Sequence, residues 1–271
     1  ERPDAFTLQD VYDTSCARTG VAEIAPALYH TARMRELAPS DEAATAAAAA
    51  GLFEHICQHM VSPSLLADDV HRHTASPMDY WLYRENFSFQ VAVSIALTYI
   101  IASAQRTPAK LAISRASGNI SLAELVPMQA TPGLIHSAEP VPFRLTPAIQ
   151  AFVTELGLEG ILPFAVHKVV QRLAEREHLL RDFLDLYVRD ELIHMPSVRA
   201  LAAVNPAALA EMCDRNVKLI VHRAAQLAEI LPPKDVQDKE LSPMQPLIHL
   251  MAQAVAPANL AQMDYVWMPW L

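Results

Sequence analysis

The chain has 271 residues, 52 % of them apolar, which is enough for the core of one large domain or two small ones. A net charge of −9 without a basic cluster gives little support for direct DNA or RNA binding. The three cysteines form no Cys-x-x-Cys pair, and we find neither a signal peptide nor an apolar run that could cross a bilayer. We therefore expect an intracellular protein with reduced thiols, in the nucleus or the cytoplasm.

The first part of the chain predicts helices. Only six glycines and long runs of Ala and Leu favour helix throughout. An amphipathic helix is expected over Phe6–Arg18, ending near Gly20, and Thr7 with Asp10 has the spacing of a capping box. Two more helices are predicted before residue 61, over Pro26–Leu37 and Asp41–Met60.

Several histidines raise the question of a metal site. The run His55-Ile-Cys57-Gln-His59 suggests a metal site, because His55 and His59 are four positions apart and share one face of a predicted helix. No third ligand follows nearby, and the general base of a His-Glu-x-x-His motif is absent. A half-exposed helix face is therefore the better interpretation, and we interpret His71 and His73 in the same way, as residues of a polar loop.

The longest apolar segment, Pro77–Ile101, carries Phe87, Val91 and Ile95 at helical spacing and predicts a core helix. The segment Leu231–Pro243 has three prolines and five charged residues, which is typical of a linker. Further helices are expected over Leu162–Ala174, Leu179–Leu192, Pro206–Ile230 and Gln245–Ala254.

The segment Tyr99–Val126, the loop segment, consists of a helix end, a polar loop and a Ser-Gly turn that predicts a short hairpin around Gly118. It resembles the catalytic segment of the phosphatidylinositol 3-kinase-related kinases, in which a polar loop and a hairpin supply the catalytic Asp and the metal ligands. In an ungapped comparison Arg106 keeps the loop arginine of that family. Gln105 replaces its catalytic Asp, Lys110 its metal-binding Asn, and Glu124 the Asp of Asp-Phe-Gly.

These replacements are unfavourable for phosphoryl transfer. A Gln105 amide cannot accept a proton as a carboxylate does. An ammonium at Lys110 repels a divalent cation by about 8 kcal/mol at 4 Å and an effective dielectric of about 20. Glu124 has a longer stem, which would misplace a metal ligand. The resemblance thus implies a pseudokinase without catalytic residues, metal or cofactor, and we predict that Lys110 and Glu124 pair with each other.

The segment Glu139–Thr146, the closing segment, contains Pro-Phe-Arg-Leu-Thr. In the same kinases this phrase closes the activation segment, which implies that the turn-rich stretch Met128–Ala138 corresponds to the activation loop. The Gly-x-x-Gly element that follows in the family is present at 157–160. Pro147 departs from the Arg or Lys of the active members and matches their inactive relatives.

The segment Ala258–Leu271, the tail segment, resembles the FATC tail of these kinases through Asn-Leu and Trp-x-Pro-Trp. Met263-Asp264 and the final Pro-Trp-Leu are similar to the pseudokinase branch of the family, the TRRAP type. The residues to which the resemblance gives a structural role are Tyr265, Trp267, Pro269 and Trp270. Because an exposed aromatic tail promotes aggregation, we expect both tryptophans to form a compact hook, buried near the activation segment.

The resemblance implies a mainly α fold, namely a kinase-like C-terminal lobe with a short β-hairpin and a FATC tail. We divide the chain into lobe (1–230), linker (231–245) and tail (246–271). Without a Gly-rich phosphate loop or a Val-Ala-x-Lys strand, we expect a piece of a larger helical-repeat scaffold. In that branch the scaffold is nuclear and joins transcription activators to histone acetyltransferase complexes such as SAGA, without direct nucleic-acid or membrane binding.

Two alternatives remain. The first is an active kinase that uses unusual residues, which ATP-dependent phosphotransfer would support. The second is a membrane-contact module, because Tyr265, Trp267, Met268 and Trp270 are types found at bilayer interfaces.

Overall fold

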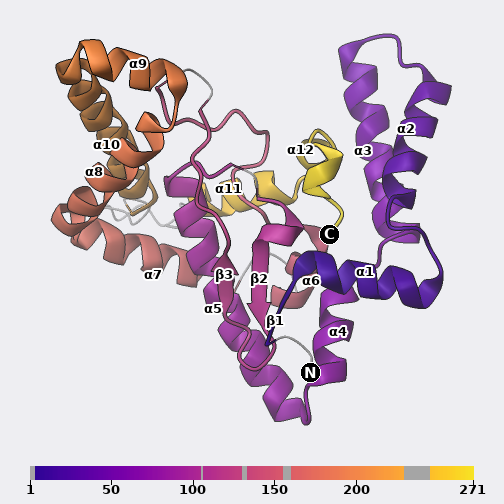
Figure 1. Ribbon diagram of the computed structural model, residues 1–271. Coiled ribbons are helices and arrows are strands. Elements are labelled where there is room, and N and C mark those ends of the chain that lie inside the picture. The colour runs from indigo at the N-terminus through magenta and orange to yellow at the C-terminus, as the bar shows by residue number, and fades with distance from the viewer. Residues whose placement is uncertain (1–3, 105, 130–132, 155–159, 229–244) are drawn as a thin grey trace, which may run out of the picture.

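The computed structural model describes residues 4–104, 106–129, 133–154, 160–228 and 245–271. They form a mostly helical structure around a small sheet (Figure 1). The first helices are α1 (Leu8–Thr19), α2 (Ala25–Leu37), α3 (Glu42–His59), α4 (Leu65–His73), α5 (Pro77–Ile100) and α6 (Pro147–Val153). They are followed by α7 (Ile161–Glu175), α8 (Glu177–Ile193), α9 (Pro196–Val204), α10 (Pro206–Ala228), α11 (Gln245–Val255) and α12 (Pro257–Leu260). Two short 3₁₀ helices are η1 (Pro108–Lys110) and η2 (Tyr265–Trp267).

The sheet has three antiparallel strands in the order β1 (Ala5–Thr7), β2 (Leu111–Ser114) and β3 (Ile120–Leu122). The predicted hairpin is confirmed: its turn contains Gly118 with φ +73°, and a Cβ there would lie 3.0 Å from the Tyr83 carbonyl oxygen. A side chain at this position would therefore be strained and crowded.

Strand β1 was not predicted, and the assignment of Phe6 to the first helix was wrong. The capping box is present as expected, since the Thr7 hydroxyl accepts from Asp10 N–H and the Asp10 carboxylate accepts from Thr7 N–H at 2.7 Å. A residue before an N-cap is free to be extended, and Phe6 pairs with Ile113 of β2. The start of the chain is thus part of the sheet that carries the loop segment.

Helix α5 is the centre of the core. Ser76 caps its N-terminus, and its buried face contacts α6, α7 and β3. Its apolar stripe recurs at the predicted helical spacing, with Phe87, Val91 and Ile95 at most 3 % exposed. The loop segment therefore begins at the C-terminal end of a helix that is held rigidly in the core.

Two predictions in the lobe need correction. His71 and His73 lie in the last turn of α4 rather than in a loop, because Leu65, Leu66 and Val70 bury one face of that helix. Helix α9, Pro196–Val204, was not predicted. The proposed linker falls on residues 229–244, outside the described residues, and only Gln245 of the expected range 231–245 is described, as the first residue of α11.

Helices α2 and α3 form a pair that extends away from the sheet (Figure 1). Helix α12 packs against α3, so the tail segment joins this pair to the rest of the lobe. Among the described helices, none combines the length and the apolar character that crossing a membrane requires.

Candidate functional site

The hairpin brings Lys110 and Glu124 together. Lys110 ends η1 directly before β2, Glu124 follows β3, and the register pairs Leu111 with Leu122. The Lys110 Nζ lies 2.5 Å from Glu124 Oε2, and the two side chains are 27 % and 51 % exposed. The predicted ion pair is therefore confirmed, at the mouth of a cleft that is partly open to solvent. Gln105, the position of the expected catalytic base, lies outside the described residues.

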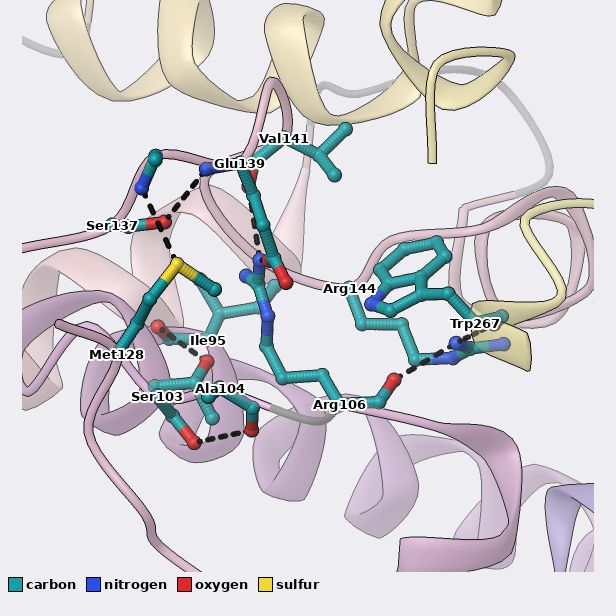
Figure 2. Close-up of polar contacts among 12 residues, drawn as sticks. Ile95, Ser103, Ala104, Arg106, Met128, Ser137, Glu139, Val141, Arg144 and Trp267 are labelled. Atoms are coloured by element: carbon teal, nitrogen blue, oxygen red, sulfur yellow. Dashed lines mark hydrogen bonds and ion pairs between the residues drawn. The ribbon is translucent and has the colours of Figure 1, made fainter. Parts of the chain in front are cut away.

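Arg106 makes a second ion pair deeper in the same cleft (Figure 2). Its Nη2 donates to the Glu139 carboxylate and, at 3.0 Å, to the Val141 carbonyl oxygen. The side chains of Arg106 and Glu139 are 5 % and 18 % exposed. Arg106 thus ties the loop segment to the closing segment in a largely water-free place.

Arg144 of the closing segment connects this pair to the tail segment. Its Nη1 donates to the carbonyl oxygens of Arg106 at 3.0 Å and Trp267 at 2.7 Å. Its Nη2 donates to those of Leu271 at 2.6 Å and Met268 at 3.2 Å. The guanidinium also lies 4.5 Å from the centre of the Trp267 ring, a cation–π geometry (Figure 2).

The charge of Arg144 is held by four main-chain oxygens and the Trp267 ring. Burial, together with the neighbouring positive charge of Arg106, lowers the pKa of Arg144 to about 9. It therefore remains protonated at neutral pH. The sequence analysis named this residue only as part of Pro-Phe-Arg-Leu-Thr, and its contacts with the tail segment were not predicted.

The tail segment is anchored as expected. Trp267 and Trp270 are 4 % and 3 % exposed, and Pro269 between them is buried. The hook begins with η2 and turns at Met268, which has φ +47° in the left-handed region. Tyr265 is 40 % exposed, and its hydroxyl hydrogen bonds His30 Nδ1 of α2 at 2.6 Å.

Helix α10 holds the stretch that resembles the activation loop. The Asn216 amide accepts from Ile135 N–H and donates to the Gly133 carbonyl oxygen, each at 2.7 Å. Arg223 donates to the Ile100 carbonyl oxygen at 2.9 Å and also to that of Ile135. Neither Asn216 nor Arg223 was predicted from the sequence to make these contacts. An Asn within a predicted apolar helix face was the one available signal, because a buried amide requires partners.

The cleft around the Lys110–Glu124 pair is small. Its cavity is about 20 Å³, room for a single water, between Thr107, Lys110, Glu124 and the two buried arginines. The Lys110 ammonium and the Glu124 carboxylate are engaged with each other. Within the described ranges, no three His, Cys, Asp or Glu side chains are grouped to hold a metal ion.

The profile of the family described as "Phosphatidylinositol 3- and 4-kinase" matches residues 2–197 of this chain. The chain belongs to this family. Its relatives include the "SAGA complex/NuA4 acetyltransferase complex subunit Tra1" of Schizosaccharomyces pombe, 31 % identical over 100 % of the chain and 8 % of that protein. The corresponding subunit of Saccharomyces cerevisiae is 30 % identical over 71 % of the chain and 5 % of that protein.

The human "Transformation/transcription domain-associated protein" is 24 % identical over the whole chain. Because it covers 7 % of that relative, the chain spans a small fraction of the length of these proteins. These matches place it in the Tra1/TRRAP type of kinase-like domain. The solved structure "Structure of the open conformation of CtTel1" shares the fold, with a TM-score of 0.68 and 15 % identity over 100 % of this chain and 9 % of that one.

Proposed function

We propose that this lobe is catalytically inactive and acts as a structural part of a scaffold subunit in histone acetyltransferase co-activator complexes of the SAGA type. The observation that carries the proposal is the ion pair between Lys110 and Glu124. It occupies the two positions from which the related kinases coordinate the metal ions of phosphoryl transfer. Phosphoryl transfer depends on those ions to neutralise developing charge, and positioning alone cannot replace them.

The role as a scaffold part rests on the relatives and on the buried contacts of the cleft. The yeast relatives are subunits of acetyltransferase complexes. In this chain Arg106 and Arg144 connect the loop, closing and tail segments. We propose that these buried contacts hold the three segments together. The expected partners are the other subunits of such a complex and, through the larger scaffold, transcription activators, in the nucleus and without direct nucleic-acid or membrane contact. The division into lobe, linker (231–245) and tail remains part of this proposal.

Calorimetric titration of the intact protein with Mg·ATP tests the inactivity. We expect no binding, and the matched control is the Lys110→Asn, Glu124→Asp double variant, which restores both ligand types. A low-micromolar dissociation constant for the unmodified protein would contradict the proposal.

A second experiment tests the role of Gln105. The single reversion Gln105→Asp is expected to restore no phosphotransfer to protein substrates, because the base returns without its metal ions. Measurable phosphorylation by that variant, or by the unmodified protein, would favour the alternative of an active kinase and would show that the loop segment is wrongly assigned.

Assembly is tested by comparing the subunits that co-purify with the intact protein and with two variants. Arg144→Leu removes the hydrogen bonds from Arg144 to the loop and tail segments, and it is expected to lower the amount of other subunits that co-purify. Lys110→Ala changes only the partly exposed pair and is expected to leave assembly intact. Equal recovery of subunits with both variants would remove the support for a structural role of these buried contacts.

A further inference from the structure

A second cavity lies on another face of the lobe, away from the degenerate cleft. It is a groove of about 570 Å³ between α1, α4, β1 and the turn of the β2–β3 hairpin. This volume is within the range of small-ligand sites in proteins. We call it the arginine groove, after the three side chains that three separate elements contribute to its lining: Arg18, Arg72 and Arg115.

The charge of the arginine groove is opposite to that of the chain. The whole sequence has 30 acidic and 21 basic residues. The groove has three guanidinium groups and two carboxylates, Asp10 and Asp69. The Asp10 carboxylate accepts from the N–H and the hydroxyl of Thr7 in the cap of α1. Asp69 is 5 % exposed and lies 3.2 Å from Arg72. The groove is thus a local positive region on an acidic protein.

Arg115 is held in a position to present its charge. Its guanidinium carbon lies 4.7 Å from the centre of the buried Phe6 ring, and its Nε is buried without a hydrogen-bond partner among the described residues. Its Nη1 lies 3.5 Å from His73 Nε2. A guanidinium that is stacked and partly removed from water attracts an anion more strongly than a fully hydrated one.

His73 extends the same surface. Its Nδ1 lies 2.7 Å from the Asp69 carbonyl oxygen, so the neutral ring carries its proton there and leaves Nε2 directed at Arg115. Side-chain exposures of 29 % for His73 and 41 % for Arg72 keep both accessible from the groove. With this tautomer Nε2 accepts from Arg115, so an anionic oxygen at this point would meet donors from Arg72 of α4 and from Arg115 of the hairpin turn.

We propose that the arginine groove binds a phosphate monoester carried by a protein segment, that is, a phosphoserine or phosphothreonine peptide. Guanidinium groups donate paired, charge-assisted hydrogen bonds to phosphate oxygens, and arginine clusters are a recurrent way to recognise phosphorylated segments. A short dianion suits a local positive region on a chain of net charge −9, whereas a long polyanion or an anionic membrane would meet the surrounding negative charge. This site is independent of the proposed inactivity of the lobe.

The test is fluorescence anisotropy on the intact protein, with a fluorescein-labelled Gly-Gly-phosphoserine-Gly-Gly peptide as the probe. We expect it to bind at least about tenfold more tightly than the unphosphorylated peptide, and inorganic phosphate to displace it. Arg18→Gln, Arg72→Gln and Arg115→Gln are each expected to weaken binding by about tenfold. Arg35→Gln, the same charge change at an exposed position of α2, is expected to leave it unchanged.

Arg18 is exposed on α1, so Arg18→Gln keeps the test valid if Arg115→Gln, which loses its stacking on Phe6, fails to fold. Thermal melting of each variant identifies that case. Equal affinity for the two peptides would overturn the proposal, and so would an equal loss in Arg35→Gln and Arg18→Gln. Tighter binding of a single-stranded oligonucleotide or of phosphatidylserine vesicles than of the phosphopeptide would also overturn it.

Discussion

The loop segment takes part in two ion pairs whose basic residues are four positions apart, and the pairs differ in burial and in the segments that they connect. Arg106 and Glu139 are 5 % and 18 % exposed, whereas Lys110 and Glu124 are 27 % and 51 % exposed. The first pair continues through Arg144 into the tail segment. The second lies at the mouth of the cleft, where both of its side chains are partly exposed to solvent. The first pair is therefore a buried connection between segments, and the second is a partly exposed contact within the hairpin.

Burial sets the energetic difference between the two pairs. Exposed ion pairs contribute about 0–1 kcal/mol because water and salt screen them and two long side chains are immobilised. Removing one partner of a buried pair costs about 3–5 kcal/mol because the other charge is left in a low-dielectric place. We use the term buried joint for the contacts among Arg106, Glu139, Arg144 and Trp267. The buried joint should thus contribute most to the free energy of unfolding. The partly exposed Lys110–Glu124 pair should contribute little to it and should mainly affect whether the cleft can bind a metal ion.

The largest expected effect comes from removing the tail side of the buried joint. Deletion of 264–271 removes Trp267 and Trp270, each worth about 3–5 kcal/mol when a buried Trp is truncated. Domains typically have only about 5–15 kcal/mol in total, so the deleted chain should unfold or become insoluble. Thermal melting and soluble yield measure this, with Trp270→Phe as the mild control. A wild-type melting temperature for the deletion would show that the tail is not structural, and liposome binding would then support membrane contact.

Arg144→Leu should have the next largest effect. The carbonyl oxygens of Arg106, Trp267 and Leu271 lose their charged donor, and each buried unsatisfied group costs about 1–3 kcal/mol. We expect a loss of about 3–5 kcal/mol in the free energy of unfolding, measured by urea titration, and earlier proteolysis of the tail segment. Arg172→Leu, at a side chain that is 78 % exposed, should change it by less than about 0.5 kcal/mol. An equal loss of unfolding free energy in Arg144→Leu and Arg172→Leu would contradict the difference between buried and exposed arginine side chains.

Asn216→Asp tests whether α10 stabilises residues 133–138 of the turn-rich stretch. The carboxylate still accepts from Ile135 N–H but cannot donate to the Gly133 carbonyl oxygen, so we expect a loss of about 1–3 kcal/mol. Its control is Asn205→Asp, because Asp caps a helix as well as Asn does at the start of α10. Faster hydrogen exchange confined to residues 133–137 would localise the effect, and unchanged exchange there would contradict it.

The helices could be predicted from local periodicity, whereas the hairpin and the pairing of Lys110 with Glu124 were predicted from the resemblance to the kinase family. The sequence did not predict Arg144, Asn216 or Arg223 as connectors. Their hydrogen bonds to the tail segment, to Ile100 and to residues 133 and 135 reach backbone groups 81 to 127 positions away, which no local pattern encodes. The membership of β1 in the sheet was missed for the same reason, since a strand of three residues has too short a pattern to be read without its partner.

A smaller effect is expected from pH at the edge of the tail segment. Burial lowers the pKa of His30 below its ordinary value of 6.5, and its Nδ1 is hydrogen bonded with the hydroxyl of Tyr265. The unfolded chain therefore binds more protons near and below pH 6.5, so stability should fall as pH decreases through this range. His30→Asn should flatten that dependence in melting curves between pH 7.5 and 5. Buried His167, whose pKa burial and Lys168 also lower, should leave a remaining slope, which His30→Asn, His167→Asn removes.

The smallest effect should belong to the partly exposed pair, and a double-mutant cycle measures it. Lys110→Ala, Glu124→Ala and the combined variant should give a coupling free energy of about 0.2–1 kcal/mol in urea titrations at low salt. Screening should reduce the coupling further in 1 M NaCl, where the Debye length is about 3 Å. A coupling of about 3 kcal/mol that survives high salt would mean that water does not reach this pair. Lys110 and Glu124 would then resemble the buried joint in their energetics, and the distinction between a buried structural pair and a screened, partly exposed pair would fail.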